Sequence, residues 1–381
     1  MKKSLRLRDN PGLVSVMASV ASILIGLLFG FVLLLILNYK NAVPGLVSLL
    51  TKGITDFGNV LYRAAPLVMV GLSVAFAYKV GLFNIGASGQ YTIGTFLALF
   101  VGIKLQLPWW MCLLAAAIGG AVWGVFPGLF KALFNVNEVL TAIMFNWIAM
   151  NLVNLLIPNV GGMLDADWGA TSTDRTALLG NANPSAILPR LGLDKLFNYP
   201  YMNIGIFLAI IIAVVLWVVL NKTTFGYELK AVGLNKSAAR YAGINEKKNI
   251  ILSMTIAGAL AGFGAGLFYL SGGAEWNPLN STSLPAMGFN GIATALLASS
   301  HPIGTVFSSL FISHITVGGA YLPTKYFPTE IADLISGIII YLCAFSMLFR
   351  GVIEKKLLHK EEKTNVNAEP APGAETGKEG K

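Results

Sequence analysis

Long apolar runs separated by short polar stretches dominate the hydrophobic pattern of this chain. A run of about 20 apolar residues is long enough to cross the hydrocarbon core of a bilayer as a helix. We therefore predict an all-α polytopic membrane protein whose two termini share one side of the membrane. Its ten predicted spans lie near residues 13–37, 57–78, 82–103, 109–131, 138–158, 203–221, 250–271, 285–300, 302–320 and 331–349, with the boundaries between 285 and 320 left open.

The polar segments predict the domain organisation. Residues 1–12 are basic and 222–249 carries more basic than acidic residues, so both are expected in the cytoplasm, where basic residues concentrate. Residues 13–350 form the predicted transmembrane domain, and the span count places the mixed-charge segment 159–202 outside. That segment is either a plain loop or a landing platform for an external binding protein. The tail 351–381 lacks an apolar face and is predicted to be disordered.

Composition agrees with a membrane protein. The 381 residues are 55% hydrophobic and 12% charged, whereas soluble domains carry about 25% charged residues. The net charge of +9 does not indicate nucleic acid, because most of the 27 basic residues fall on the predicted cytoplasmic side. Glycines recur every four residues at Gly120, Gly124 and Gly128 and again at Gly258, Gly262 and Gly266, which predicts closely packed helices.

The segment 222–249 is patterned as two short helices. Gly233 is expected to stop the first, Asn235 to cap the second and Gly243 to end it. The small pair Ala238 and Ala239 leaves one side of the second helix slim enough to enter a cleft in a partner. The alternative is a solvated connector.

A resemblance bears on this choice. The string FGxxLxAVGxNxxAARxxGIN, from Phe225 to Asn245, resembles the cytoplasmic coupling segment of ABC importer permeases that carry simple sugars, nucleosides or branched-chain amino acids. The resemblance implies a cytoplasmic ATPase partner, a second permease subunit (identical or a paralogue), an extracytoplasmic binding protein and a bacterial cell membrane location. The coupling residues that it implies are Phe225, Gly226, Glu228, Gly233, Asn235, Ala238, Ala239, Arg240 and Gly243.

A short string recurs once in the chain. Gly81–Ala87 (GLFNIGA) returns loosely as Met287–Ala293 (MGFNGIA), each at the start of an apolar span. Glycine-interrupted segments at matching positions of two halves point to a transport pathway. We interpret the pair as an inverted repeat with broken helices; a chance echo is the alternative.

The first copy also narrows the family resemblance. Phe83–Gln90, together with Asn137–Val139 and Ile143–Ile148, resembles the nucleoside branch of these permeases, and the resemblance covers most of residues 57–350. It implies nucleosides as the cargo, without saying which ones. A simple-sugar or branched-chain amino-acid permease remains the alternative within the same class.

The chain lacks the motifs of an enzyme. No phosphate-binding GxxxxGK(S/T) loop occurs, so ATP hydrolysis is expected on a partner, and no catalytic residue, cofactor or metal is predicted. His301, His314 and His359 are scattered and are expected to be structural. Arg63 and Glu138 sit near span ends, where snorkelling or a mutual ion pair is the plain interpretation. Few carboxylates lie within the spans, which argues against a stand-alone secondary carrier, the alternative of another class.

Neutral polar side chains within the spans suit a neutral cargo. Amides can bond hydroxyl groups, and a tryptophan can stack on a base. The alternative role for such amides is to join helices by hydrogen bonds. The predicted pathway residues are Asn84, Ser88, Gln90, Glu138, Asn146, Trp147, Asn151 and Asn290.

Overall fold

The computed structural model describes residues 11–278 and 283–327, with isolated positions between 334 and 351. Helices make up nearly all regular structure in these residues. The predicted last span and the predicted tail lie largely outside them. The longer helices are α1 (Pro11–Asn38), α2 (Ala42–Thr55), α3 (Phe57–Tyr78), α4 (Ala87–Leu99), α5 (Trp109–Phe134), α6 (Glu138–Asn159), α9 (Gly205–Lys222), α10 (Thr224–Leu234), α12 (Glu246–Tyr269), α13 (Ala286–Leu297) and α14 (Pro302–Ala320).

The long apolar runs do form helices. Among the described residues, seven helices are long and apolar enough to cross a membrane: α1, α3, α5, α6, α9, α12 and α14. Each coincides within a few residues with a predicted span. The chain is therefore a polytopic all-α membrane protein. Of the three other predicted spans, 82–103 and 285–300 take a different form and 331–349 lies largely outside the described residues.

Two predicted spans take a different form. The run at 82–103 is helical only from Ala87, where α4 begins, and it ends in the π-helix η2 (Phe100–Lys104). The run at 285–300 holds only α13, which has 12 residues. At about 1.5 Å per residue α13 is too short for a hydrocarbon core of about 30 Å, so the prediction of a full span there is wrong.

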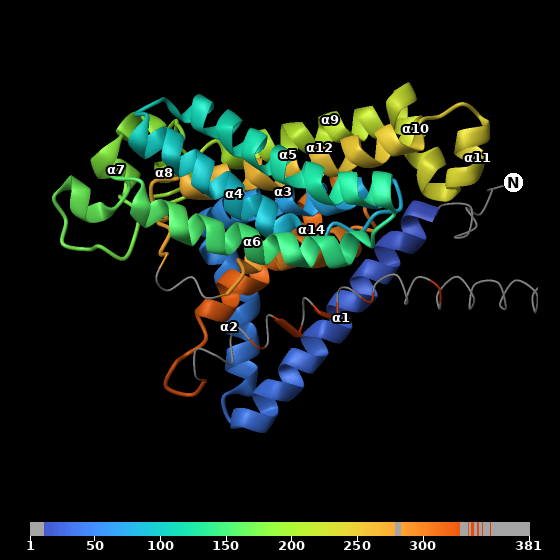
Figure 1. The fold of residues 1–381 in the computed structure, drawn as a ribbon. Helices are drawn as coiled ribbons and strands as arrows, with labels where there is room; N and C mark the ends of the chain where they lie inside the picture. Colours follow the sequence, from blue (N-terminus) through green and yellow to red (C-terminus); the bar gives the residue numbers. More distant parts are fainter. Residues whose placement is uncertain are drawn as a thin grey trace, which may run out of the picture.

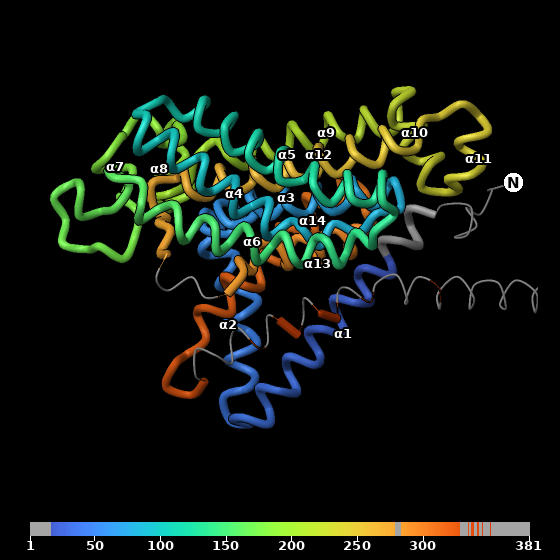
Figure 2. Tube along the Cα trace, in the orientation of Figure 1, coloured from blue at the N-terminus to red at the C-terminus, as the bar shows by residue number. Residues whose placement is uncertain are grey.

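Helix α2 is not among the predicted elements. Its 14 residues are too few to span, and they mix apolar positions with Ser48, Thr51 and Lys52. One face packs inward through Ala42, Gly45 and Leu49, while Val43, Val47 and Ile54 are exposed. α1 and α2 project together from one side of the helical body, as the blue tube in Figure 2 shows.

Glycines allow a close contact between two long helices of the body. α5 and α12 meet where Gly120 faces Gly258 and Gly124 faces Met254, and a Cβ at Gly120 or Gly258 would overlap the other residue's carbonyl. The glycine pattern therefore brings two helix backbones together, as predicted. α3 runs through the interior, and its apolar window is almost completely buried although Pro66 lies within it.

The two ends of the body carry different segments. In Figure 1, α10 and α11 (Lys236–Tyr241) lie at one end, while α7 (Leu179–Ala182) and α8 (Leu193–Leu196) lie at the opposite end. The 159–202 segment is packed against the body. Backbone N–H groups of Thr176 and Leu188 donate to the carbonyls of Trp276 and Leu270, both at 2.8 Å.

Candidate functional site

Two short helices begin at one contact inside the body. Ser88, in the first turn of α4, donates from its Oγ to the carbonyl of Pro285, just before α13, at 3.1 Å. Gly288 of α13 lies against the backbone of Ser88, so that no Cβ fits there.

From this contact the two helices run in opposite directions. Beyond α4, the Nζ of Lys104 reaches the carbonyl of Gly161, near the end that carries α7 and α8. α13 leads to His301, which lies close enough to Lys79 for the lysine charge to act on it, and Lys79 packs against Gly233 of α10. This is the arrangement that broken helices of inverted orientation would give.

The repeated string accounts for only one of the two breaks. Residues 79–86, called the break below, are non-helical, as predicted for the first copy, and Gly81 adopts a φ of +74° that glycine favours. The second copy, Met287–Ala293, lies wholly within α13. The prediction of a break inside that copy is therefore wrong.

Buried amides hold the break in place. The Asn84 Nδ2 donates to Ser73 Oγ at 2.9 Å and to Gln90 Oε1 at 2.8 Å, and the Gln90 Nε2 returns a bond to Asn84 Oδ1 at 3.2 Å. All three side chains are fully buried. Their polar groups are thus bonded to one another rather than directed to solvent.

Asn146 of α6 fastens the start of α4. Its Oδ1 accepts from the Gly89 N–H at 2.8 Å, and its Nδ2 donates to the Ile85 carbonyl at 3.0 Å. The first turn of a helix has N–H groups without intrahelical partners, and the N-cap position here is Gly86, which has no side chain. Asn146 therefore caps α4 from a neighbouring helix.

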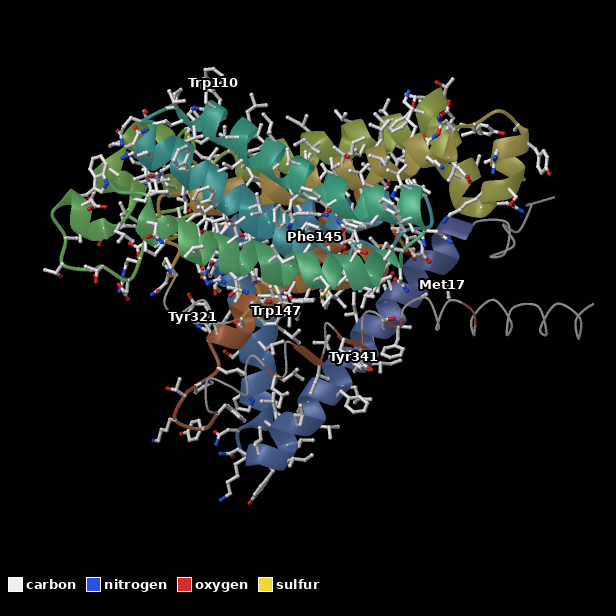
Figure 3. The ribbon with its side chains drawn as sticks, viewed as in Figure 1. Met17, Trp110, Phe145, Trp147, Tyr321 and Tyr341 are labelled. Atoms are coloured by element: carbon white, nitrogen blue, oxygen red, sulfur yellow. The ribbon has the colours of Figure 1, made fainter. Side chains whose placement is uncertain are left out.

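The predicted pathway residues thus divide into two groups. Asn84, Ser88, Gln90 and Asn146 gather around the start of α4 and are buried. The others lie elsewhere: Trp147 and Asn151 on the outward face of α6, Asn290 half-buried on α13, and Glu138 at the first residue of α6. Figure 3 places Trp147 on the side of the body from which α1 and α2 project.

Glu138 does not pair with Arg63. Its carboxylate lies 2.8 Å from the Lys131 Nζ, with both side chains mostly buried, whereas the Arg63 Nε donates to Asn59 Oδ1 at 3.0 Å. The two residues belong to opposite ends of the body. The mutual ion pair, one of the two plain interpretations of these residues, is therefore wrong.

Residues 222–249, which we call the coupling segment after the role that the resemblance implies, fold as their local signals indicate. The Asn235 side chain accepts from the Ala238 N–H at 3.0 Å and caps α11, and Gly243 follows α11 with a φ of +81°. Gly233 has another role than predicted. It lies inside the last turn of α10, where the backbone of Lys79 and Val80 leaves no room for a Cβ.

Four further coupling residues that the resemblance implies are packed against the chain itself. Gly226 fits against the end of α9, and Phe225 is half-buried. Glu228 accepts from the Asn249 Nδ2 at 3.1 Å and so ties α10 to α12. Ala239 is 4% exposed because it packs into the core of this chain, so of the small pair only Ala238 is on the exposed side of the helix; entry of that helix into a partner's cleft stays a prediction.

Other side chains of the segment point outward. Tyr241 is 95% exposed and Leu234 is 89% exposed, and Tyr227, Ala238 and Arg240 are exposed as well. We call these five residues the coupling surface. The sequence reasoning missed its two tyrosines and its leucine, although apolar side chains within a charged cytoplasmic segment were a visible signal.

The two described histidines form hydrogen bonds within the fold. His301 caps α14 by accepting from the Gly304 N–H at 3.3 Å, and His314 Nε2 bonds the Leu50 carbonyl at 2.9 Å. His359 lies outside these residues. Within residues 11–278 and 283–327, no three His, Cys, Asp or Glu side chains gather to hold a metal ion.

Comparison with known proteins gives a consistent result. The family model described as branched-chain amino acid transport system / permease component matches residues 56–344. The guanosine ABC transporter permease protein NupP of Bacillus subtilis (strain 168) is 35% identical over 88% of this chain and 94% of its own length. The nucleoside ABC transporter permease protein NupB of Lactococcus lactis subsp. cremoris (strain MG1363) is 34% identical over 93% and 98%.

A sugar permease is also similar. The glucose ABC transporter permease protein TsgB13 of Haloferax volcanii is 29% identical over 90% of each chain. No solved structure matches this chain.

Proposed function

Because the chain belongs to the branched-chain amino acid transport system / permease component family, it is a multi-pass permease of the cell membrane, and we propose that it imports nucleosides. One observation carries the cargo assignment. Two relatives named as guanosine or nucleoside permeases align with this chain over nearly their whole length. The family alone does not distinguish nucleosides from sugars or branched-chain amino acids.

The cargo is tested by uptake. Cells with and without this chain are given radiolabelled guanosine or uridine, with ribose, free bases or leucine as competitors. We expect uptake that depends on the chain and is competed only by nucleosides. Saturation by ribose or leucine, with no nucleoside uptake, would assign the cargo to the other branches and leave the permease assignment standing.

The energy source would be a cytoplasmic ATPase that binds the coupling surface. A large exposed Tyr and an Arg are side chains that commonly dominate protein interfaces. We expect Tyr241→Ala and Arg240→Glu each to weaken ATPase co-purification at least tenfold, while Ser237→Ala, on the same exposed helix, has little effect. An importer that takes up nucleosides without any co-purifying ATPase would be a secondary carrier.

The predicted topology says which segments could meet an external partner. Residues 1–10, 222–249 and 350–381 would face the cytoplasm, and 159–202 would receive an extracytoplasmic binding protein. Cysteines at Thr173 and Ser237, in a chain whose Cys112 and Cys343 are replaced by Ser, should differ in labelling by an impermeant thiol reagent on intact cells. Equal labelling contradicts the topology.

The cargo would pass along the outward face of α6, which a second permease subunit would complete. Trp147 is 46% exposed and can stack on a base, and Asn151 is exposed four residues later, so both lie on one face of the helix. We expect Trp147→Ala and Asn151→Ala to lower uptake without loss of assembly. The half-buried Asn290 would contribute from α13, while Asn84, Ser88, Gln90 and Asn146 would hold the backbone behind this face.

A further inference from the structure

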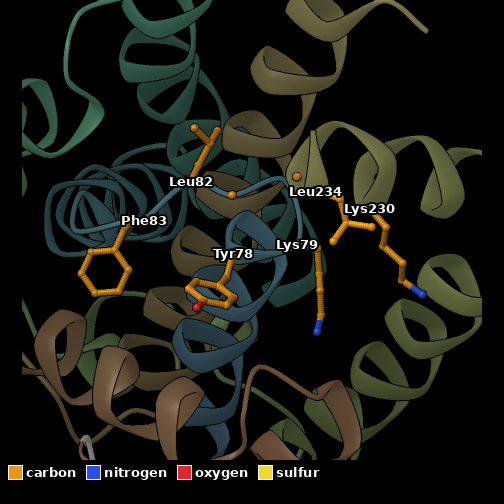
Figure 4. A pocket seen from close by; sticks show the side chains of 8 residues that line it. Tyr78, Lys79, Leu82, Phe83, Lys230 and Leu234 are labelled. Atoms are coloured by element: carbon orange, nitrogen blue, oxygen red, sulfur yellow. The ribbon is translucent and has the colours of Figure 1, made fainter. Parts of the chain in front are cut away.

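A cavity of about 550 Å³ lies between the C-terminal end of α3, the break and α10. Figure 4 shows the side chains that line it. The lysines Lys79 and Lys230 line this cavity together with the apolar or aromatic residues Tyr78, Leu82, Phe83 and Leu234. The lining contains two basic side chains and no acidic one.

Among the described residues, no carboxylate pairs with the positive charge of this cavity. None of the ion pairs formed among the described residues involves Lys79 or Lys230, and the Lys230 Nζ is bonded only to the neutral Asn221 Oδ1, at 2.8 Å. Burial lowers the pKa of Lys79, and the nearby Lys230 charge lowers it further. The Lys79 charge also contributes, after burial, to a lowered pKa of His301. An anion in the cavity would stabilise the charged form of Lys79 and offset the repulsion between Lys79 and Lys230.

The position of the cavity restricts what the anion can be. Lys79 directly follows the last residue of the α3 span, which places it at the depth of the lipid headgroups. Basic pockets between membrane helices on the cytoplasmic side bind phosphate-containing headgroups, and the aromatic walls offer contact to an apolar or aromatic body. A lysine binds phosphate as a point charge.

We propose that this cavity, lined by Lys79 and Lys230, binds the phosphate group of an anionic ligand that carries an apolar or aromatic body. An anionic phospholipid of the cytoplasmic leaflet and a soluble nucleotide share this chemistry. The bound phosphate would join the end of α3 to α10, and so hold the coupling segment against the break where Gly233 meets Lys79. The cytoplasmic location, and with it the choice of phosphate as the anion, rests on the proposed coupling role, whereas the unpaired positive charge of Lys79 and Lys230 does not.

Native mass spectrometry of the importer, purified with its partner subunits in neutral detergent, tests the site. One arm titrates phosphatidylglycerol against phosphatidylcholine, and the other titrates guanosine 5′-monophosphate. Lys79→Gln and Lys230→Gln remove the two charges one at a time. Lys222→Gln is the matched control, because Lys222 is exposed at the end of α9 and does not line the cavity.

We expect one of the two phosphate ligands to bind, and each cavity variant to weaken it about fivefold, the effect of one basic residue near an anionic headgroup. The arm that shows this pattern identifies the source. Binding that is unchanged in both variants, or that falls equally in Lys222→Gln, overturns the proposal. If Lys79→Gln does not assemble, Lys230→Gln decides. Nucleoside uptake is not the readout, so this proposal and the cargo assignment fail separately.

Discussion

The Asn146 amide offers a direct test of what holds the break, and we predict that Asn146→Ala destabilises the protein. The substitution removes the acceptor of the Gly89 N–H and the donor to the Ile85 carbonyl. Gly89 is buried, and the Asn146 amide oxygen is among the atoms nearest to it, so the substitution removes the acceptor at a site away from bulk solvent. The start of α4 would then carry an unsatisfied N–H inside the body.

Two general estimates bound the expected loss of stability. A buried group left without its partner costs about 1–3 kcal/mol, whereas interhelical hydrogen bonds in membranes average about 0.6 kcal/mol and reach about 1.7. Two bonds to backbone groups are lost at once. We therefore expect the free energy of unfolding to fall by about 2 kcal/mol.

Asn151→Ala is the matched control on the same helix. The Asn151 Nδ2 bonds only the carbonyl of Trp147 in its own helix, at 2.8 Å, and the side chain is exposed. Both substitutions gain the same helix propensity, which cancels in the comparison. The control should change stability by less than about 0.5 kcal/mol.

The assay is unfolding of the purified protein in mixed micelles of rising SDS content, followed by circular dichroism. A difference between the two variants below about 0.5 kcal/mol would refute the capping role of Asn146. The break would then depend on packing alone.

Two further predictions concern helix contacts. Gly258→Ala places a Cβ against the Gly120 carbonyl and should destabilise the α5–α12 contact by about 1–3 kcal/mol, whereas Gly180→Ala, with open space around it, should be neutral in the same unfolding assay; equal effects would contradict the close contact. Glu138→Gln leaves the mostly buried Lys131 ammonium without its carboxylate and should cost about 1–3 kcal/mol, less than for a fully buried pair. Adding Lys131→Met should recover much of that loss, and a neutral single variant would show that the ion pair contributes nothing.

Apolar runs predicted most of the membrane helices because hydrophobic length is itself the physical requirement for spanning. The same criterion misjudged 285–300, where the apolar run and its helix are both too short for a full span. The chain enters α13 only at Ala286, and after Leu297 it leaves through Ser299 and Ser300, whose φ values of 49° and 55° lie in the left-handed region. Serine rarely adopts this conformation, so composition does not indicate it.

Local sequence signals predicted where a helix of the coupling segment begins and ends better than they predicted which of its residues are exposed. Caps depend on neighbouring residues, and Asn235 and Gly243 act as their positions suggested. The face of a six-residue helix depends on what packs beside it, so the burial of Ala239 could not be read from the string. The role of Gly233 likewise depends on Lys79, which is far away in the sequence.

The asparagines of α6 show why the sequence alone could not say which polar side chains of a span face the protein. Asn146 and Asn151 are five residues apart, which at about 3.6 residues per turn separates them by about 140° around the helix. They therefore cannot serve the same side, but the periodicity does not say which one faces the protein. The fold settles this, because Asn146 bonds α4 and the break while Asn151 is exposed beside Trp147. A cargo that reached the Asn146 amide would have to displace the Gly89 N–H, whereas one that touches Trp147 and Asn151 leaves the break intact. The outward face of α6 is thus the less costly place for a neutral solute to bind.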